Sequence, residues 1–224
     1  MIKVVLLDLD GTLIDSERYY CEGTYEWIQR FGFKGRLEDV YPIIGTTMDE
    51  TCRIIAEELL NGSMTCQEVY DYNAKFFREE KPMICSDYIF EEVKASVIKL
   101  KEAGYRLAIC SSSTLDEIDF AISSLGFKQY IDFIDSSHEC EHGKPAPDVY
   151  LSALNYFDVE PQEAIVVEDS YSGILAGKNA NIYTIARKDY RFNIDQSMAD
   201  AYVDGLDEVY DLIKEIDDGR CNHN

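Results

Sequence analysis

The fold of this chain is decided by residues 4–15, which read Val-Val-Leu-Leu-Asp-Leu-Asp-Gly-Thr-Leu-Ile-Asp. The apolar run at residues 4–7 predicts a strand that is buried on both faces of a parallel sheet. It stops at two carboxylates, Asp8 and Asp10, and Gly11 then lets the backbone turn at once. Because side chains alternate along a strand, we expect Asp8 and Asp10 to point the same way. Ligands of open α/β sheets bind beyond the carboxyl ends of the strands, so the sequence predicts a site here.

Two carboxylates in one small volume need a neutralising partner. Like charges at such a distance repel strongly unless a cation or a proton lies between them. A hard divalent ion that prefers oxygen ligands, Mg²⁺ above all, is the simplest solution. The alternative is that the acidic pair only ends a strand and begins a surface turn, because Asp and Gly are ordinary turn residues. The choice between the two depends on partners elsewhere in the chain.

Composition limits the classes of protein to consider. The chain has 224 residues, of which 46% are hydrophobic and 29% charged, which indicates one large globular domain or a domain with an insertion. A net charge of −22 and a pI near 4.4 argue against nucleic acid and anionic membranes as partners. No window approaches the roughly 20 apolar residues of a membrane helix, and no signal-peptide pattern precedes the strand. We therefore expect a cytoplasmic protein whose seven scattered cysteines are reduced.

The segment from Ser16 to residue 83 has a helical pattern throughout. Thr47 and Thr65 each begin a capping box, with Glu50 and Glu68 three residues later, and the helices should run to about residues 60 and 78. No part of this segment resembles a buried parallel strand. The sequence therefore predicts a core domain of residues 1–15 and 84–224, with residues 16–83 inserted as a separate helical domain.

From residue 87 onward, helical and strand patterns alternate. We predict helices at residues 88–103, 115–125, 147–157 and 206–216, and strands at residues 105–110, 130–134, 164–167 and 182–185. Repeated strand–helix units imply an α/β fold with a parallel sheet that helices cover on both faces.

Polar side chains follow three of these segments. Ser111 and Ser112 come directly after a strand, Lys144 lies in Gly-Lys-Pro-Ala-Pro-Asp, and the pair Glu168-Asp169 ends another strand. Each alone is compatible with an ordinary turn or surface role. Together with residues 8–15, in this order and spacing, they resemble the four motifs of the haloacid dehalogenase-like hydrolase superfamily. The resemblance spans residues 4 to about 186 and is closest to its helical-cap phosphatase and β-phosphoglucomutase-like branch.

The resemblance implies a Rossmann-like core with an inserted α-helical cap domain and a chemistry of phosphate transfer. Asp8 is expected to be the nucleophile that becomes an aspartyl phosphate, and Asp10 the general acid and base. A small phosphorylated metabolite is the expected substrate, hydrolysed by a monomer or weak homo-oligomer. The expected phosphate-binding residues are Ser111, Ser112, Lys144 and Thr12, and the expected Mg²⁺ ligands are Asp8, the backbone carbonyl of Asp10, Asp169 and, directly or through water, Glu168.

The inserted helices would then close over the cleft, with Asp15 and Ser16 beginning the hinge and the region of Pro82 ending it. Tyr20 is a candidate for contact with the substrate, although it is equally suited to the helix core. The other candidates in the cap are Gly45, Thr46 and Thr47.

Three alternatives remain open. A phosphosugar mutase on the same fold has a His at the position of Tyr20, an Arg within residues 46–48 and a Lys-Asn pair at residues 114–115; this chain has none of them. A phosphonate-cleaving relative needs a reactive Lys in the cap. A non-catalytic binding or regulatory protein is disfavoured because all four motifs are present.

One further cluster is His138, Cys140 and His142, which has side chains suited to a transition metal. No second segment with matching metal-ligating side chains accompanies it, so we interpret it as a solvated loop beside Lys144.

Overall fold

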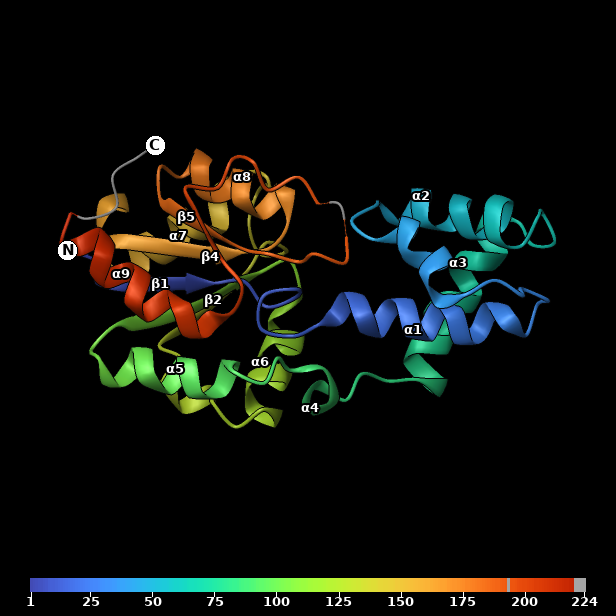
Figure 1. The fold of residues 1–224 in the computed structure, drawn as a ribbon, viewed down its shortest axis with the longest axis horizontal. Coiled ribbons are helices and arrows are strands. Elements are labelled where there is room, and N and C mark those ends of the chain that lie inside the picture. Colours follow the sequence, from blue (N-terminus) through green and yellow to red (C-terminus); the bar gives the residue numbers. More distant parts are fainter. Residues whose placement is uncertain (193, 220–224) are drawn as a thin grey trace. The chain divides into compact units, whose positions relative to one another are not determined.

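The computed structural model describes residues 1–192 and 194–219, which form two compact units (Figure 1). The core unit combines Met1–Asp15 with the chain from Cys85 onward, and the helical unit comprises Ser16–Ile84. Cys221 lies outside the described residues, and the six described cysteines form no disulfide. None of the described helices is long and apolar enough to cross a membrane.

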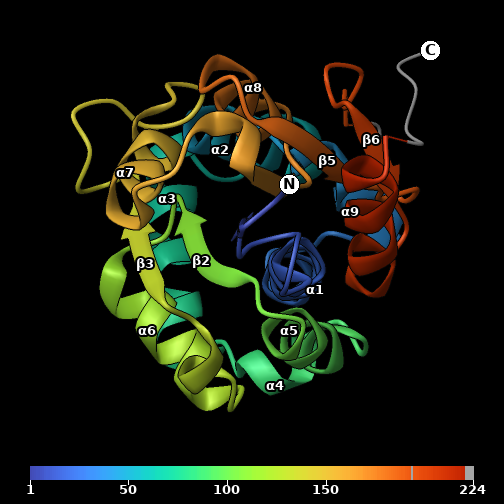
Figure 2. The ribbon, with the colours of Figure 1, turned by 90° about the vertical axis from the view of Figure 1, so that its left-hand side faces the viewer.

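A six-stranded, fully parallel sheet forms the centre of the core unit, in the order β3-β2-β1-β4-β5-β6 (Figure 2). β1 lies in the middle because its four residues are all apolar and fully buried. Leu7 at its end is paired with Ile109 on one side and Val167 on the other, so three strands end at the same edge. The strands are β1 (Val4–Leu7), β2 (Arg106–Ser111), β3 (Phe133–Ser136), β4 (Ala164–Glu168), β5 (Tyr183–Arg187) and β6 (Ala201–Val203).

Helices cover both faces of this sheet, as predicted (Figure 2). α7 (Asp148–Phe157) and α8 (Tyr171–Asn179) pack on one face, where the alternate residues of β1, β2 and β4 form a continuous apolar cluster with them. α5 (Val93–Glu102), α6 (Leu115–Ser124) and α9 (Val209–Asp217) lie on the other face, and the short α4 (Cys85–Tyr88) contacts α6. The predicted α/β class with a parallel sheet is confirmed.

The helical unit has its own core. α1 (Ser16–Gln29), α2 (Met48–Arg53) and α3 (Cys66–Lys75) enclose Trp27, whose indole Nε1 donates a hydrogen bond to Asn73 at 3.1 Å. π-helical turns continue α2 over Ile54–Leu59 and α3 over Phe76–Glu80, and a 3₁₀ segment spans Leu37–Ile43. Residues 16–84 contain no strand.

The capping box at Thr65 forms as the sequence predicts, and it offers a measure of local stability. Thr65 N donates to the Glu68 carboxylate at 2.8 Å, and Glu68 N donates to Thr65 Oγ1 at 3.2 Å. Replacing Thr65 with Ala should therefore lower the free energy of unfolding by about 1 kcal/mol, because α3 loses the acceptor at its N-terminus. Urea unfolding followed by circular dichroism measures this loss. Glu68→Gln is the control, since Gln preserves the box; an equal loss in both variants would contradict the assignment.

The predicted helix at residues 88–103 is wrong in its first turn, because the chain there pairs with another segment. Ile14 and Ile89 form an antiparallel bridge, and Asp15 N donates to Tyr88 O at 2.8 Å. Backbone groups engaged in this ribbon are not available to a helix, so α5 begins only at Val93.

Other elements also differ from the prediction. The strand predicted at residues 130–134 lies at Phe133–Ser136, because Lys128–Tyr130 forms a 3₁₀ turn first. Pro147 precedes α7 as its N-cap instead of being its first residue. The edge strand β6 was not predicted at all.

Candidate active site

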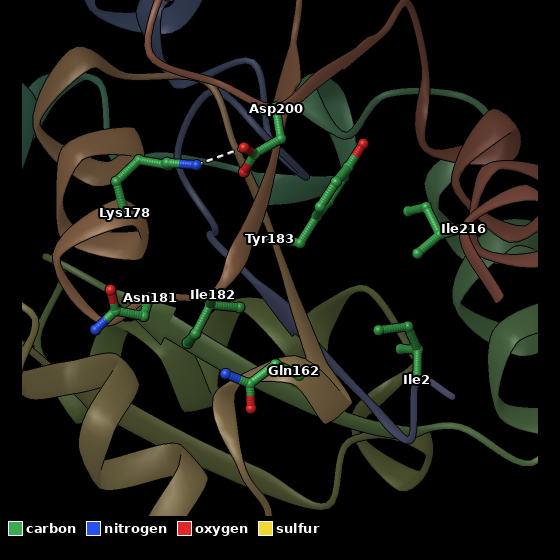
Figure 3. Close-up of a pocket in the computed structure, with 8 residues that line it drawn as sticks. All are labelled: Ile2, Gln162, Lys178, Asn181, Ile182, Tyr183, Asp200 and Ile216. Carbon is green, nitrogen blue, oxygen red and sulfur yellow. Dashed lines mark hydrogen bonds and ion pairs between the residues drawn. The ribbon is translucent and has the colours of Figure 1, made fainter. Parts of the chain in front are cut away.

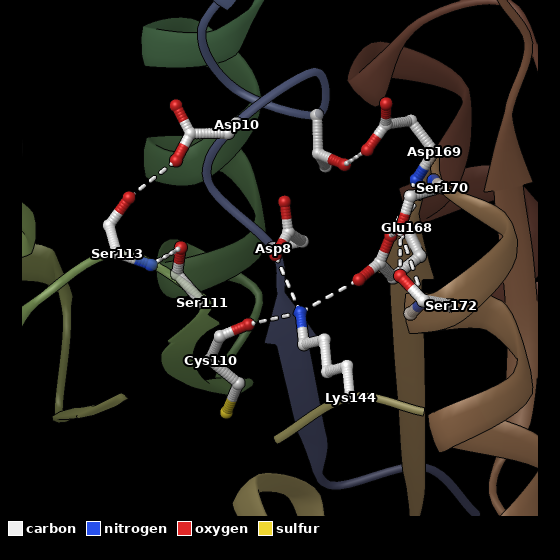
Figure 4. A network of polar contacts seen from close by, with 12 residues as sticks. Asp8, Asp10, Cys110, Ser111, Ser113, Lys144, Glu168, Asp169, Ser170 and Ser172 are labelled. Atoms are coloured by element: carbon white, nitrogen blue, oxygen red, sulfur yellow. Dashed lines mark hydrogen bonds and ion pairs between the residues drawn. The ribbon is translucent and has the colours of Figure 1, made fainter. Parts of the chain in front are cut away.

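Asp8 lies directly after β1 and at the centre of the polar cluster in Figure 4. Its backbone N–H donates to Val167 O at 3.0 Å, which continues the pairing between β1 and β4 by one residue. The side chain is 8% exposed, and one carboxylate oxygen accepts a hydrogen bond from Lys144 Nζ at 2.6 Å. A buried carboxylate is thus held by a neighbouring cation.

Lys144 comes from the loop between β3 and α7 and is almost fully buried. Besides Asp8, its Nζ donates to Glu168 Oε1 at 2.7 Å and to Cys110 O at 2.9 Å. Burial by itself disfavours the ammonium charge, but the carboxylates of Asp8 and Glu168 raise the pKa of Lys144 well above its usual value. Lys144 is therefore a permanently charged group with all three of its N–H donors engaged.

Glu168 fixes Lys144 through a carboxylate that protein donors fill on both oxygens. Oε1 accepts from Lys144 and, at 3.2 Å, from the Tyr150 hydroxyl. Oε2 accepts from Asp169 N at 2.9 Å and from Ser170 N and Oγ, both at 3.0 Å. A Cβ on Gly173 would lie 1.5 Å from Oε1, so only Gly fits there. The absence of a side chain at Gly173 therefore lets the first turn of α8 lie directly against the Glu168 carboxylate.

Three buried carboxylates lie close enough together that the site could hold a metal ion. Asp8, Glu168 and Asp169 each offer an oxygen within 4.8 Å of the others, the only such group that the described residues contain. Three carboxylates around one ammonium leave two negative charges in excess, which suits a divalent cation with oxygen ligands. Burial and the charge of Glu168 raise the pKa of Asp8 well above its ordinary value, although Lys144 acts in the opposite direction.

The turn after Asp8 is shaped by this acidic group. Gly11 has φ +79°, and a Cβ there would lie 2.0 Å from Asp169 Oδ2. The Thr12 hydroxyl donates to Asp169 Oδ1 at 3.4 Å, and Thr12 is fully buried. Gly11 and Thr12 therefore support Asp169 from the opposite loop.

The Asp10 carboxylate does not join the acidic group. β1 ends at Leu7, so the alternation of a strand does not extend to Asp10, and the expectation that Asp8 and Asp10 share one direction is not met. Asp10 Oδ2 instead accepts a hydrogen bond from Ser113 Oγ at 2.6 Å (Figure 4). Ser113 is not among the predicted site residues, and its only signal in the sequence is its place as the third residue of a Ser-Ser-Ser run.

The other predicted phosphate-binding residues lie at the end of β2. Ser111 is buried, and its hydroxyl accepts a hydrogen bond from Ser113 N at 3.0 Å. Ser112 is exposed. The structure thus brings together Asp8, Lys144, Glu168 and Asp169, with Ser111 connected to Asp10 through Ser113.

The predicted cap residues lie within the helical unit. Tyr20 is 47% exposed, with its ring edge-on to those of Tyr19 and Phe77, so it is not a core residue. Thr46 Oγ1 donates to Ile43 O at 2.6 Å, and Thr47 caps α2 by accepting from Glu50 N. Gly45 has φ +71° and open space around its Cα.

The loop of His138, Cys140 and His142 does not form a metal site among the described residues. Cys140 Sγ donates to Ser136 O, and His142 pairs with Asp148 at 3.3 Å. The solvated-loop interpretation agrees with this arrangement.

A separate hollow of about 380 Å³ contains none of the predicted site residues (Figure 3). It lies where β1 and β5 begin, so it is at the opposite edge of the sheet from Asp8. Lys178 and Asp200 close its polar side as an ion pair. Its lining residues are Ile2, Gln162, Lys178, Asn181, Ile182, Tyr183, Asp200 and Ile216.

Known proteins are similar to this chain in sequence and in fold. A pyrophosphatase PpaX from Bacillus velezensis is 30% identical over 194 residues, which cover 82% of each chain. The structure of a putative β-phosphoglucomutase from Thermotoga maritima superposes with a TM-score of 0.77 at 25% identity, covering 96% of this chain and all of the other. A predicted phosphoglycolate phosphatase from Haemophilus somnus, at 18% identity and TM-score 0.76, shares the fold over 95% of this chain and 98% of its own.

The family comparison covers all four motifs at once. Residues 5–187 match the haloacid dehalogenase-like hydrolases, a span that contains Asp8, Ser111, Lys144 and Asp169. The resemblance inferred from the sequence is confirmed: this chain belongs to the haloacid dehalogenase-like hydrolase family.

Proposed function

We propose that this protein is a Mg²⁺-dependent phosphatase that hydrolyses a small phosphorylated metabolite, such as a sugar or polyol phosphate, through an aspartyl phosphate on Asp8. We further propose that it works in the cytoplasm as a monomer or weak homo-oligomer. The observation that carries the proposal is the setting of Asp8, a buried carboxylate between the Lys144 ammonium at 2.6 Å and the carboxylates of Glu168 and Asp169. The chain belongs to a family of hydrolases, which agrees with this reaction.

The first step forms a bond between an Asp8 oxygen and phosphorus while the bond from phosphorus to the leaving oxygen breaks. Asp10 gives its proton to that leaving oxygen. In the second step, water attacks phosphorus, Asp10 takes the water proton, and phosphate departs as the Asp8 carboxylate re-forms. One group therefore serves as acid and then as base.

Lys144 and a metal ion stabilise the charge on the transferring group. The Lys144 ammonium donates a hydrogen bond to the Asp8 carboxylate, so it lies beside any group that becomes bonded to Asp8. Asp8, Asp169 and the backbone carbonyl of Asp10 would hold Mg²⁺, while the filled carboxylate of Glu168 makes it the anchor of Lys144. Bound Mg²⁺ would add positive charge against the phosphoryl oxygens and let the carboxylates stay ionised.

The helical unit is the proposed cap, with Tyr20, Gly45, Thr46 and Thr47 as substrate contacts. Tyr20 is 47% exposed and Gly45 has open space around its Cα, which supports both as candidates, whereas the Thr46 and Thr47 hydroxyls bond within their own unit.

A phosphosugar mutase is less well supported. The segments that should carry its Arg and its Lys-Asn pair, residues 46–48 and 114–115, contain Thr47 and Thr114, which cap α2 and α6, and Tyr20 stands in place of its His. Pyrophosphate is a second candidate substrate, because the Bacillus velezensis relative is named a pyrophosphatase.

Phosphate release from p-nitrophenyl phosphate, a panel of sugar phosphates and pyrophosphate tests the proposal. With Mg²⁺ we expect turnover of at least one of them, and EDTA should lower its rate at least about 100-fold, because the carboxylates lose the cation that neutralises them. Re-addition of Mg²⁺ is the control and should restore the rate. Interconversion of sugar phosphate isomers without phosphate release would favour the mutase, and a rate that EDTA leaves unchanged would contradict the metal assignment.

A further inference from the structure

The Asp10 carboxylate has a single hydrogen-bond partner among the described residues, the hydroxyl of Ser113. The distance of 2.6 Å between Ser113 Oγ and Asp10 Oδ2 is that of a direct, short O–H···O hydrogen bond. Asp10 itself lies in the turn after β1, which leaves its side chain without support from a strand or helix. Its orientation therefore depends on Ser113.

Ser113 is itself held on both sides of its backbone. Its N–H donates to Ser111 Oγ at 3.0 Å, and its carbonyl accepts from Ser136 Oγ at 2.6 Å. Ser111 ends β2 and Ser136 ends β3, so two neighbouring strands fix the position of Ser113. The next residue, Thr114, begins α6 with a complete capping box. The Ser113 hydroxyl thus projects from a rigid base.

We infer that Ser113 is the positioning residue for Asp10: it holds Oδ2 and leaves Oδ1 as the oxygen that delivers the proton to the leaving group. The inference rests on the proposed function and adds to it a residue outside the predicted site. Because Ser113 donates to Oδ2, Oδ1 is the oxygen from which Asp10 can give a proton. In the first step that proton moves to the leaving oxygen as its bond to phosphorus breaks, and Asp10 becomes a carboxylate whose charge the Ser113 hydrogen bond stabilises.

This role has a consequence that a purely structural role lacks. The p-nitrophenolate anion leaves without a proton, whereas phenolate and an alkoxide are more basic and depend increasingly on the acid. A misplaced Asp10 therefore lowers the rate of hydrolysis most for the ester with the most basic leaving group and least for p-nitrophenyl phosphate. The ratio kcat/KM reports only the steps through formation of the aspartyl phosphate, so the later hydrolysis does not obscure this order.

The experiment compares wild type with Ser113→Ala on p-nitrophenyl phosphate, phenyl phosphate and glycerol 2-phosphate, all with Mg²⁺. We expect kcat/KM to fall at least about 10-fold for phenyl and glycerol phosphate and less than about 3-fold for p-nitrophenyl phosphate, since general acid catalysis contributes about 10²–10⁴-fold. Asp10→Asn should show the same order with larger losses. Ser113→Thr keeps the hydroxyl and should restore most of the activity on the poorer leaving groups.

Ser123→Ala is the matched control, because Ser123 is exposed on α6 and its removal should leave all three rates unchanged. An equal loss on every ester in Ser113→Ala, or no loss on any, would overturn the inference while leaving the phosphatase intact. Absence of Mg²⁺-dependent release in wild type would instead overturn the proposed function and remove the basis of the inference. The two failures are thus distinguishable.

Discussion

Asp8→Asn should lower kcat for phosphate release by at least about 10³-fold, because an amide does not form the acyl phosphate on which both steps depend. The substitution replaces one carboxylate oxygen with an amide NH2 group and keeps one oxygen that can accept from Lys144. Lys144 also keeps its contacts with Glu168 and Cys110 O. We therefore expect a folded, inactive protein. A continuous assay of the best substrate from the panel, with wild type and variant at equal protein concentration, measures the loss.

The same variant should change the pH dependence of stability in a defined direction. Burial and the charge of Glu168 raise the folded-state pKa of Asp8, whereas in the unfolded chain it is about 4. The native state thus holds the proton more tightly, and stability from this group is lost as pH rises from about 4 towards the raised pKa. Without metal, wild type should therefore lose stability relative to Asp8→Asn over that range. Urea unfolding in EDTA at several pH values measures the difference.

Mg²⁺ should reverse this comparison. An ion that binds the native carboxylates stabilises wild type as its concentration exceeds its dissociation constant, and the variant loses one of those ligands. Asp211 on α9 is exposed, and its ion pair with Lys99, at 3.7 Å, lies on the surface. Asp211→Asn is therefore the control, and neither activity nor pH dependence should change. Retained Mg²⁺-dependent turnover in Asp8→Asn would exclude Asp8 as the nucleophile.

The central strands were predictable because a strand buried on both faces is a continuous run of apolar residues in the sequence. Val4–Leu7 and Ala164–Glu168 are fully buried, and their apolar runs end where the strands end, or one residue before. β6 has no such apolar run, since only Val203 of its three residues is buried. The break between α4 and α5 was equally hidden, because it depends on pairing with Ile14, more than seventy residues earlier.

The charged groups around Asp8 were predictable, whereas two of the hydroxyl groups that hold charged residues of the site were not. Asp8, Lys144, Glu168 and Asp169 were named because charges at strand ends are conspicuous, and the structure brings them together. Ser113 was missed because a serine in a turn is ordinary. The Tyr150 hydroxyl on Glu168 was also missed, since an aromatic residue within an amphipathic helix is normally a core residue.

Lys144→Met should have the largest effect on stability, because it removes the only cation that contacts Asp8 and Glu168 among the described residues. Two carboxylates then remain buried without a cation beside them, and the free energy of unfolding in EDTA should fall by about 3–5 kcal/mol. Turnover should fall about 10²–10³-fold or more, because the transferring oxygens lose a fixed positive charge. Urea unfolding and the phosphate assay measure the two effects.

A matched control and a second substitution separate electrostatics from packing. Lys101→Met removes a cation at 2.5 Å from Asp132, but both side chains are partly exposed, so the loss should stay below about 1 kcal/mol. Adding Glu168→Gln to Lys144→Met removes one of the uncompensated charges, so the double variant should regain part of the stability without regaining activity. A double variant that is less stable than Lys144→Met would mean that the ammonium acts mainly through packing. A recovery, by contrast, would identify the buried charge of Glu168 as the reason that Lys144 is required for folding as well as for catalysis.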